Sequence, residues 1–181
     1  QMAAHVDSLR IGGGGATLGW RGETAILTVT TMMGQYTIEE INAAYAEIAT
    51  QGADSLVIDL RENGGGAFAV LPLVRHVIDE PLEAGIFVSQ PWNAAHGRAP
   101  TAADIAGTPS WEGWSLRSFW QAVQVNALTP IRFDPVTENG FDGPVYVLIS
   151  ATTASAAELA ADALKASGRA TLIGEVTAGQ M

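Results

Sequence analysis

The 181-residue chain contains no cysteine, a single lysine and no apolar run that approaches the length of a membrane span. Without cysteine, disulfide bonds, thiol nucleophiles and thiolate metal sites are excluded, but the compartment stays open because cytosolic and extracytoplasmic proteins can both lack cysteine. The first ten residues lack the basic start and apolar core of a signal peptide. We therefore expect a soluble chain without a membrane span.

Basic residues are scarce: nine Lys and Arg stand against 19 Asp and Glu, which gives a formal net charge of -10. Such a charge repels nucleic acid and anionic membranes, so neither is expected as a partner. No cluster of His, Asp and Glu has the spacing of a metal site, and we predict no metal and no cofactor. The length and the 48% apolar composition favour one domain, or a large fragment of one.

The first third of the chain has recognisable turn, helix and strand patterns. Glycines 12–15 precede the strand expected at 24–31, so they fit a turn and not a nucleotide-binding fingerprint. Residues 37–40 match a capping box, and apolar residues then recur at helical spacing until Gly52. An apolar run at 55–60 is typical of a strand buried on both faces of a parallel sheet.

The middle of the chain is less regular. The turn at 63–66 is followed by a second expected helix around 71–78. Residues 83–142 are then interpreted as an irregular insertion that contains one short helix and four tryptophans, Trp92, Trp111, Trp114 and Trp120. Such an aromatic cluster can form a small satellite core, or it can form a lid or substrate surface.

Regular patterning returns with a buried strand at 145–149, a helix from Ser155 to Lys165 and a strand at 170–173. Strands alternating with helices predict an α/β fold with a largely parallel sheet and flanking helices. Functional sites in such folds lie at the carboxyl ends of strands. Two strand-to-helix junctions, at 59–66 and 150–158, are therefore the candidate sites.

Both junctions fit nucleophilic catalysis, and both also have plain structural explanations. A serine at a helix start after a buried strand, as Ser155 is, lies beside free amides that stabilise negative charge. The glycines at 64–66 would let the main chain approach a substrate carbonyl and complete an oxyanion hole. Locally, however, Ser155 to Glu158 is also a capping box, and the glycine turn could be an ordinary tight turn.

Three segments resemble the C-terminal processing, or tail-specific, protease family of serine peptidases. Residues 59–66 resemble its DLRxNxGG signature, 153–158 its TASAxE nucleophile segment, and 168–179 its strand and GExTxG turn. The similarity spans roughly residues 24–180, apart from most of the insertion. It implies a fold related to crotonase and the ATP-dependent caseinolytic protease. It also implies Ser155 as nucleophile, oxyanion donors at Ala156 and at Gly65 or Gly66, and a turn shaped by Asp59, Arg61 and Asn63.

The resemblance does not supply a general base. Family members with a serine-lysine dyad have lysine at the place of Gln180, and an amide cannot accept the proton. The only lysine, Lys165, lies ten residues along the helix from Ser155, about 15 Å away by helical rise. The chain therefore resembles the branch without that lysine, which includes the tricorn core and interphotoreceptor retinoid-binding protein modules.

A histidine base is the alternative in that branch. His5 is the upstream candidate that the tricorn type implies. The spacing of His76 favours packing on its helix, and His96 lies in the insertion, so both are weaker candidates. The base can also lie in sequence outside this chain.

The leading expectation is a serine peptidase that forms an acyl-enzyme on Ser155 and acts on a peptide or protein substrate. A noncatalytic apolar-ligand-binding module on the same fold and a crotonase-like acyl-thioester enzyme stay as alternatives. We expect a single peptidase-core domain over 1–181, incomplete at one or both ends, and too short at the start for a PDZ module. The resemblance alone favours an extracytoplasmic location, and the oligomeric state is not readable from the sequence.

Overall fold

The computed structural model describes residues 14–111, 113 and 115–181, which fall into two compact units. One unit comprises residues 14–82 and Asp134–Met181, and the other comprises Glu83–Phe133. The second unit lies within the insertion expected at 83–142 and ends at residue 133.

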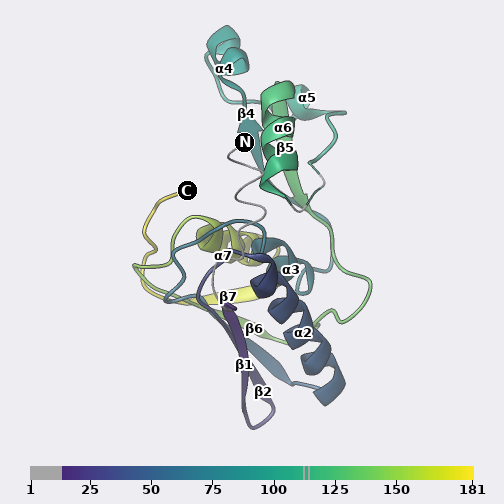
Figure 1. Cartoon of the computed structure of the whole chain (residues 1–181), viewed down its shortest axis with the longest axis vertical. Coiled ribbons are helices and arrows are strands. Elements are labelled where there is room, and N and C mark those ends of the chain that lie inside the picture. Colours follow the sequence, from purple (N-terminus) through teal and green to yellow (C-terminus); the bar gives the residue numbers. More distant parts are fainter. Residues whose placement is uncertain (1–13, 112, 114) are drawn as a thin grey trace. The chain divides into compact units, whose positions relative to one another are not determined.

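The larger unit is built on a five-stranded sheet in the order β1-β2-β3-β6-β7 (Figure 1). β1 pairs with β2 in antiparallel fashion, whereas β2, β3, β6 and β7 run parallel to one another. The α/β fold with a largely parallel sheet is therefore confirmed. Sequence reasoning missed the first strand, which pairs with β2 through a two-residue turn. The strands are β1 (Ala16–Arg21), β2 (Thr24–Val29), β3 (Ser55–Asp59), β6 (Val145–Ile149) and β7 (Ala170–Gly174).

Three helices of this unit pack together beside the sheet: α2 (Gln35–Gln51), α3 (Val70–Arg75) and α7 (Ala156–Ala166) (Figure 1). Burial alternates along β2 and β3, so one face of these strands carries the core and the other is partly exposed. The fully buried core includes Leu27, Ile41, Leu56, Ile58 and Leu164. No helix within the described part of the chain has the length and apolar character needed to cross a bilayer.

The start of α2 differs from the predicted capping box. The helix begins at Gln35 after Gly34, and the Thr37 hydroxyl donates to Met33 O at 2.7 Å. The Glu40 carboxylate instead accepts from Ala16 N–H at 2.9 Å, which ties the helix to β1. The capping box predicted at 37–40 is therefore wrong, because the Thr37 hydroxyl bonds a carbonyl four residues earlier and the Glu40 carboxylate bonds β1. The end is as predicted, with Gly52 in the left-handed conformation (φ 76°) that terminates many helices.

The second unit is more regular than the irregular insertion that was expected. A two-stranded sheet of β4 (Leu82–Val88) and β5 (Leu128–Phe133) accompanies helices α4 (Gln90–His96), α5 (Ala102–Ile105) and α6 (Leu116–Val125). Phe119 makes edge contacts with Phe87 and Trp111, at centroid distances of 4.7 and 5.4 Å. This is a satellite core, although the side chains of Phe87 and Trp120 remain 50% and 52% exposed. Trp114 lies outside the described residues.

Candidate active site

The two predicted junctions meet at the carboxyl ends of the neighbouring strands β3 and β6. Gly65 lies so close to Ser155 that a Cβ added at Gly65 would be 2.7 Å from the Cβ of Ser155 and 3.2 Å from the backbone N of Ala156. Gly65 also has a φ of 97°, which side-chain-bearing residues rarely adopt. Only glycine fits this position, so the glycine turn and the serine form one site.

Asn63 connects the segments that build the site. Its buried side chain donates to Val29 O at 3.0 Å and accepts from Gly65 N–H at 2.9 Å, and its main-chain oxygen accepts from Ala154 N–H at 3.0 Å. One residue therefore fixes the end of β2, the glycine turn and the segment before Ser155. The structure places Asn63 in the turn-shaping position that the resemblance implied for it.

Ser155 has an unusual backbone conformation, with φ 53° and ψ -122°. Helix N-caps normally lie in the β region, and a non-glycine residue at positive φ is strained by about 1–3 kcal/mol. A sharp strand-to-helix turn of this kind is how hydrolase folds present a nucleophilic serine. The Glu158 side chain accepts from the Ser155 N–H, as in a capping box. Capping alone, however, does not require the strained conformation of Ser155.

Two backbone N–H groups at the site make no hydrogen bond within the described part of the chain, those of Ala156 and Gly66. The Gly65 N–H, by contrast, is already bonded to Asn63 Oδ1. Of the two glycines that the resemblance offered as oxyanion donors, Gly66 is the one with an available N–H. Gly66 has a φ of 144°, and a Cβ there would lie 2.6 Å from the carbonyl carbon of Met32.

Glu158 is the functional residue whose role sequence reasoning missed. Its carboxylate accepts four hydrogen bonds, from Thr177 Oγ1 (2.7 Å) and from the N–H groups of Gly179 (2.7 Å), Ser155 (2.8 Å) and Gln180 (2.9 Å). These bonds, led by the one from Thr177, hold the pKa of the Glu158 carboxyl below its usual value. The sequence did contain a signal for this role, because Glu158 is the glutamate of the TASAxE segment and a GExTxG turn follows it. Thr177 and Gly179 of that turn donate to the Glu158 carboxylate.

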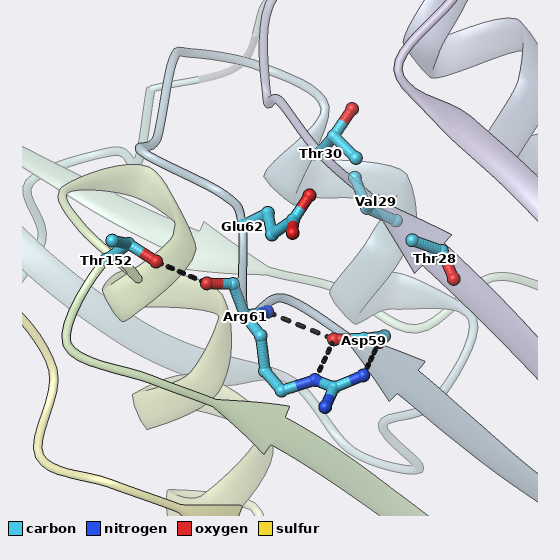
Figure 2. Close-up of a pocket in the computed structure, with 7 residues that line it drawn as sticks. All are labelled: Thr28, Val29, Thr30, Asp59, Arg61, Glu62 and Thr152. Carbon is cyan, nitrogen blue, oxygen red and sulfur yellow. Dashed lines mark hydrogen bonds and ion pairs between the residues drawn. The ribbon is translucent and has the colours of Figure 1, made fainter.

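A pocket of ≈ 490 Å³ opens beside the two junctions (Figure 2). Its walls are residues 28–30 at the end of β2, Asp59, Arg61, Glu62 and Thr152. The Arg61 guanidinium bonds both carboxylate oxygens of Asp59, at 2.9 and 2.7 Å, and this contact lowers the pKa of Asp59. The Ser150 and Thr152 hydroxyls both donate to Arg61 O, which ties this wall to the serine junction.

No histidine in the described residues contacts Ser155. His76 is buried, stacks on Tyr45 at 4.4 Å and bonds Asn139 O and Asn42 Oδ1 through its two ring nitrogens. Burial lowers its pKa, which fits the packing role expected for it. His96 stacks on Trp92 in the second unit. His5 lies outside the described residues.

Lys165 lies in the last turn of α7, at the opposite end of the helix from Ser155.

Within the described residues, no group of three or more His, Cys, Asp or Glu side chains could hold a metal ion.

The chain is similar in sequence to two known proteins. A carboxyl-terminal-processing protease of Synechocystis sp. is 31% identical over 142 residues, and one of Picosynechococcus sp. is 32% identical over 141 residues. Both alignments cover 78% of this chain, but the chain spans only about a quarter (25%) of each relative's length.

Solved structures show the same fold. The photosystem II D1 C-terminal processing protease superposes with a TM-score of 0.56 at 24% identity, over 87% of this chain and 31% of that chain. Mature CPAF complexed with lactacystin gives a TM-score of 0.58 at 20% identity, over 92% of this chain and 41% of that chain. A sequence model of peptidase family S41 matches residues 23–181. The chain belongs to peptidase family S41.

Proposed function

We propose that this chain carries the nucleophile and oxyanion hole of a serine-type peptidase, which cleaves peptide bonds through an acyl-enzyme on Ser155. The observation that carries this proposal is the contact between Gly65 and the strained Ser155. A structural cap needs neither the positive φ of Ser155 nor a glycine pressed against it. An exposed nucleophile beside an oxyanion hole needs both.

In the proposed reaction, Ser155 Oγ attacks the carbonyl carbon of the scissile peptide bond and gives up its proton to a general base. The negative charge that develops on the carbonyl oxygen is stabilised by the N–H groups of Ala156 and Gly66. The carbon–nitrogen bond then breaks, the amine leaves with a proton, and the acyl group remains as an ester on Ser155. Water hydrolyses this ester and restores the serine. Loss of one oxyanion donor typically lowers kcat by about 10²–10³.

His5 stays the proposed base of this chain, by resemblance to the tricorn type. The Glu158 carboxylate is a poor alternative because four donors already occupy its oxygens. Gln180 cannot take a proton at physiological pH.

Fluorophosphonate labelling tests the nucleophile directly, because these reagents react with activated serines. We expect the folded chain and its Ser167→Ala variant to be labelled, and Ser155→Ala not to be. Ser167 is a matched control at the other end of α7, where its hydroxyl donates to Leu164 O and accepts from the Arg169 N–H. Labelling that persists in Ser155→Ala, or that is absent from all three folded proteins, would contradict the proposal.

A noncatalytic apolar-ligand-binding module is the second candidate. It is favoured by Gln180 in place of the dyad lysine and by the half-exposed Phe87 and Trp120 of the second unit. An apolar fluorescent probe should then bind tightly to wild type and equally to Ser155→Ala, and Trp120→Ala should weaken the binding. Equal binding to Trp120→Ala would exclude the second unit as the ligand site.

A further inference from the structure

The pocket beside the serine junction has an unbalanced set of charges. Arg61 binds Asp59 through its main-chain N–H (3.1 Å) and two guanidinium nitrogens, so these two charges neutralise each other. Glu62 makes no hydrogen bond or ion pair among the described residues, and its carboxylate points toward Val29 and Thr30 across the pocket (Figure 2). Arg61 also attracts Glu62, so two carboxylates share one guanidinium and the three side chains leave the pocket with a net charge of -1.

Two of the three threonine hydroxyls in the pocket wall are already used as donors. The Thr30 hydroxyl donates to Gly15 O at 3.3 Å, and the Thr152 hydroxyl donates to Arg61 O. An anionic ligand would therefore meet an unpaired carboxylate and few free donors. A ligand that brings its own donors and a positive charge would satisfy the Glu62 carboxylate.

We propose that this pocket is a substrate subsite that accepts a basic side chain, lysine or arginine, of the bound peptide. This proposal rests on the proposed peptidase function, because the subsite would bind a side chain of the same peptide that Ser155 attacks. Thr152 precedes Ser155 by three residues, and Glu62 precedes Gly65 by three, so the segments that carry the two halves of the active site also line the pocket. Its volume of ≈ 490 Å³ lies in the range of small-ligand sites, roughly 300–1,000 Å³.

The expected preference is modest because Glu62 is exposed to solvent. An exposed ion pair strengthens binding roughly two- to fivefold, and added salt weakens it. The net charge of -10 also attracts basic peptides at longer range. Removing any single exposed carboxylate weakens this general attraction to a similar extent, so a control variant separates it from the effect of Glu62.

Binding to the Ser155→Ala variant tests this subsite without requiring turnover. The probe is an N-acetylated, C-amidated alanine pentapeptide with lysine, norleucine or glutamate as its third residue, titrated by NMR. We expect the lysine peptide to bind roughly two- to fivefold more tightly than the norleucine peptide, with shifts at the Glu62 and Thr30 amides. A further Glu62→Gln substitution should abolish this difference, and high salt should shrink it.

Glu23→Gln is the matched control, since Glu23 is an exposed carboxylate in the β1–β2 turn, at the opposite end of β2 from the pocket. It should keep the lysine preference. Equal affinities for lysine and norleucine peptides, a preference for glutamate, or a preference that survives Glu62→Gln would overturn the basic subsite. Failure of the peptidase function shows separately, as absent fluorophosphonate labelling at Ser155. A lysine preference without labelling at Ser155 would support the basic subsite and contradict only the proposed catalytic step.

Discussion

The backbone N–H groups of Ser155 and Gln180 donate to the same atom, Oε2 of Glu158, at 2.8 and 2.9 Å. Residues 177–180 are thereby fastened to the turn that carries the serine, although β7 and α7 separate the two segments in sequence. The shared oxygen places residue 180 beside Ser155. We propose that residue 180, an amide in this chain, occupies the place that the dyad lysine has in the family members with a serine-lysine dyad.

Gln180→Lys should create a base within reach of Ser155. We expect the fluorophosphonate labelling rate to rise about tenfold or more, because a general base contributes about 10²–10⁴ in rate. The gain should grow as the pH rises, since only the neutral amine accepts a proton. Met181→Lys is the control for a lysine one residue away. Equal labelling rates of the two variants at every pH would show that residue 180 does not face the serine.

Glu158 should make stability depend on pH. Its folded-state pKa is lower than its ordinary value of 4.5, so its stabilising effect is complete above that value. The effect is lost as the pH falls from there through the folded-state pKa. Glu158→Gln lacks this contribution, so its deficit in unfolding free energy should narrow in acid. Urea unfolding over a pH series measures the deficit, with Asp162→Asn on the exposed side of α7 as control. A deficit that does not change with pH would contradict this role.

Gly65→Ala should disable the site while its neighbour tolerates the same change. The added methyl would lie 2.7 Å from Ala154 O and from the Cβ of Ser155, at a φ of 97°. A Cβ at Gly64 meets no atom within 4 Å. We expect labelling to fall more than about tenfold in Gly65→Ala, since displacement of an oxyanion hole costs about 10²–10³, and to be nearly unchanged in Gly64→Ala. Equal effects would mean that the close contact is not required.

Asn63→Ala should lower the free energy of unfolding by about 2–4 kcal/mol. The substitution leaves Val29 O and Gly65 N–H without their side-chain partner, and each buried unsatisfied group costs about 1–3 kcal/mol. Asn93→Ala, at an exposed position of α4, should change stability by less than about 0.5 kcal/mol. Urea denaturation compares the two variants, and similar losses would rule out Asn63 as the connecting residue.

The sequence was sufficient to predict both junctions and an α/β fold with a largely parallel sheet. The short apolar run 55–60 lies just before a glycine-rich turn and the run 145–149 just before a serine, and both runs form strands in the structure. The proximity of Gly65 and Ser155 followed from the family resemblance and the rule that strand ends share one edge.

Other features depend on partners that local pattern does not reveal. The Glu40 carboxylate binds β1 instead of capping α2, and the Gly65 N–H is taken by Asn63. The strands β4 and β5 escaped prediction because they pair across about 40 intervening residues, among prolines and tryptophans that resemble an irregular loop.

The most direct test of Ser155 as the nucleophile is the site of covalent modification. The folded chain is treated with a fluorophosphonate, digested, and the adduct is located by tandem mass spectrometry. We expect a single modified residue, Ser155, and no adduct when the protein is denatured before treatment. An adduct on another serine, or an unmodified Ser155 in a protein that unfolds cooperatively, would contradict it.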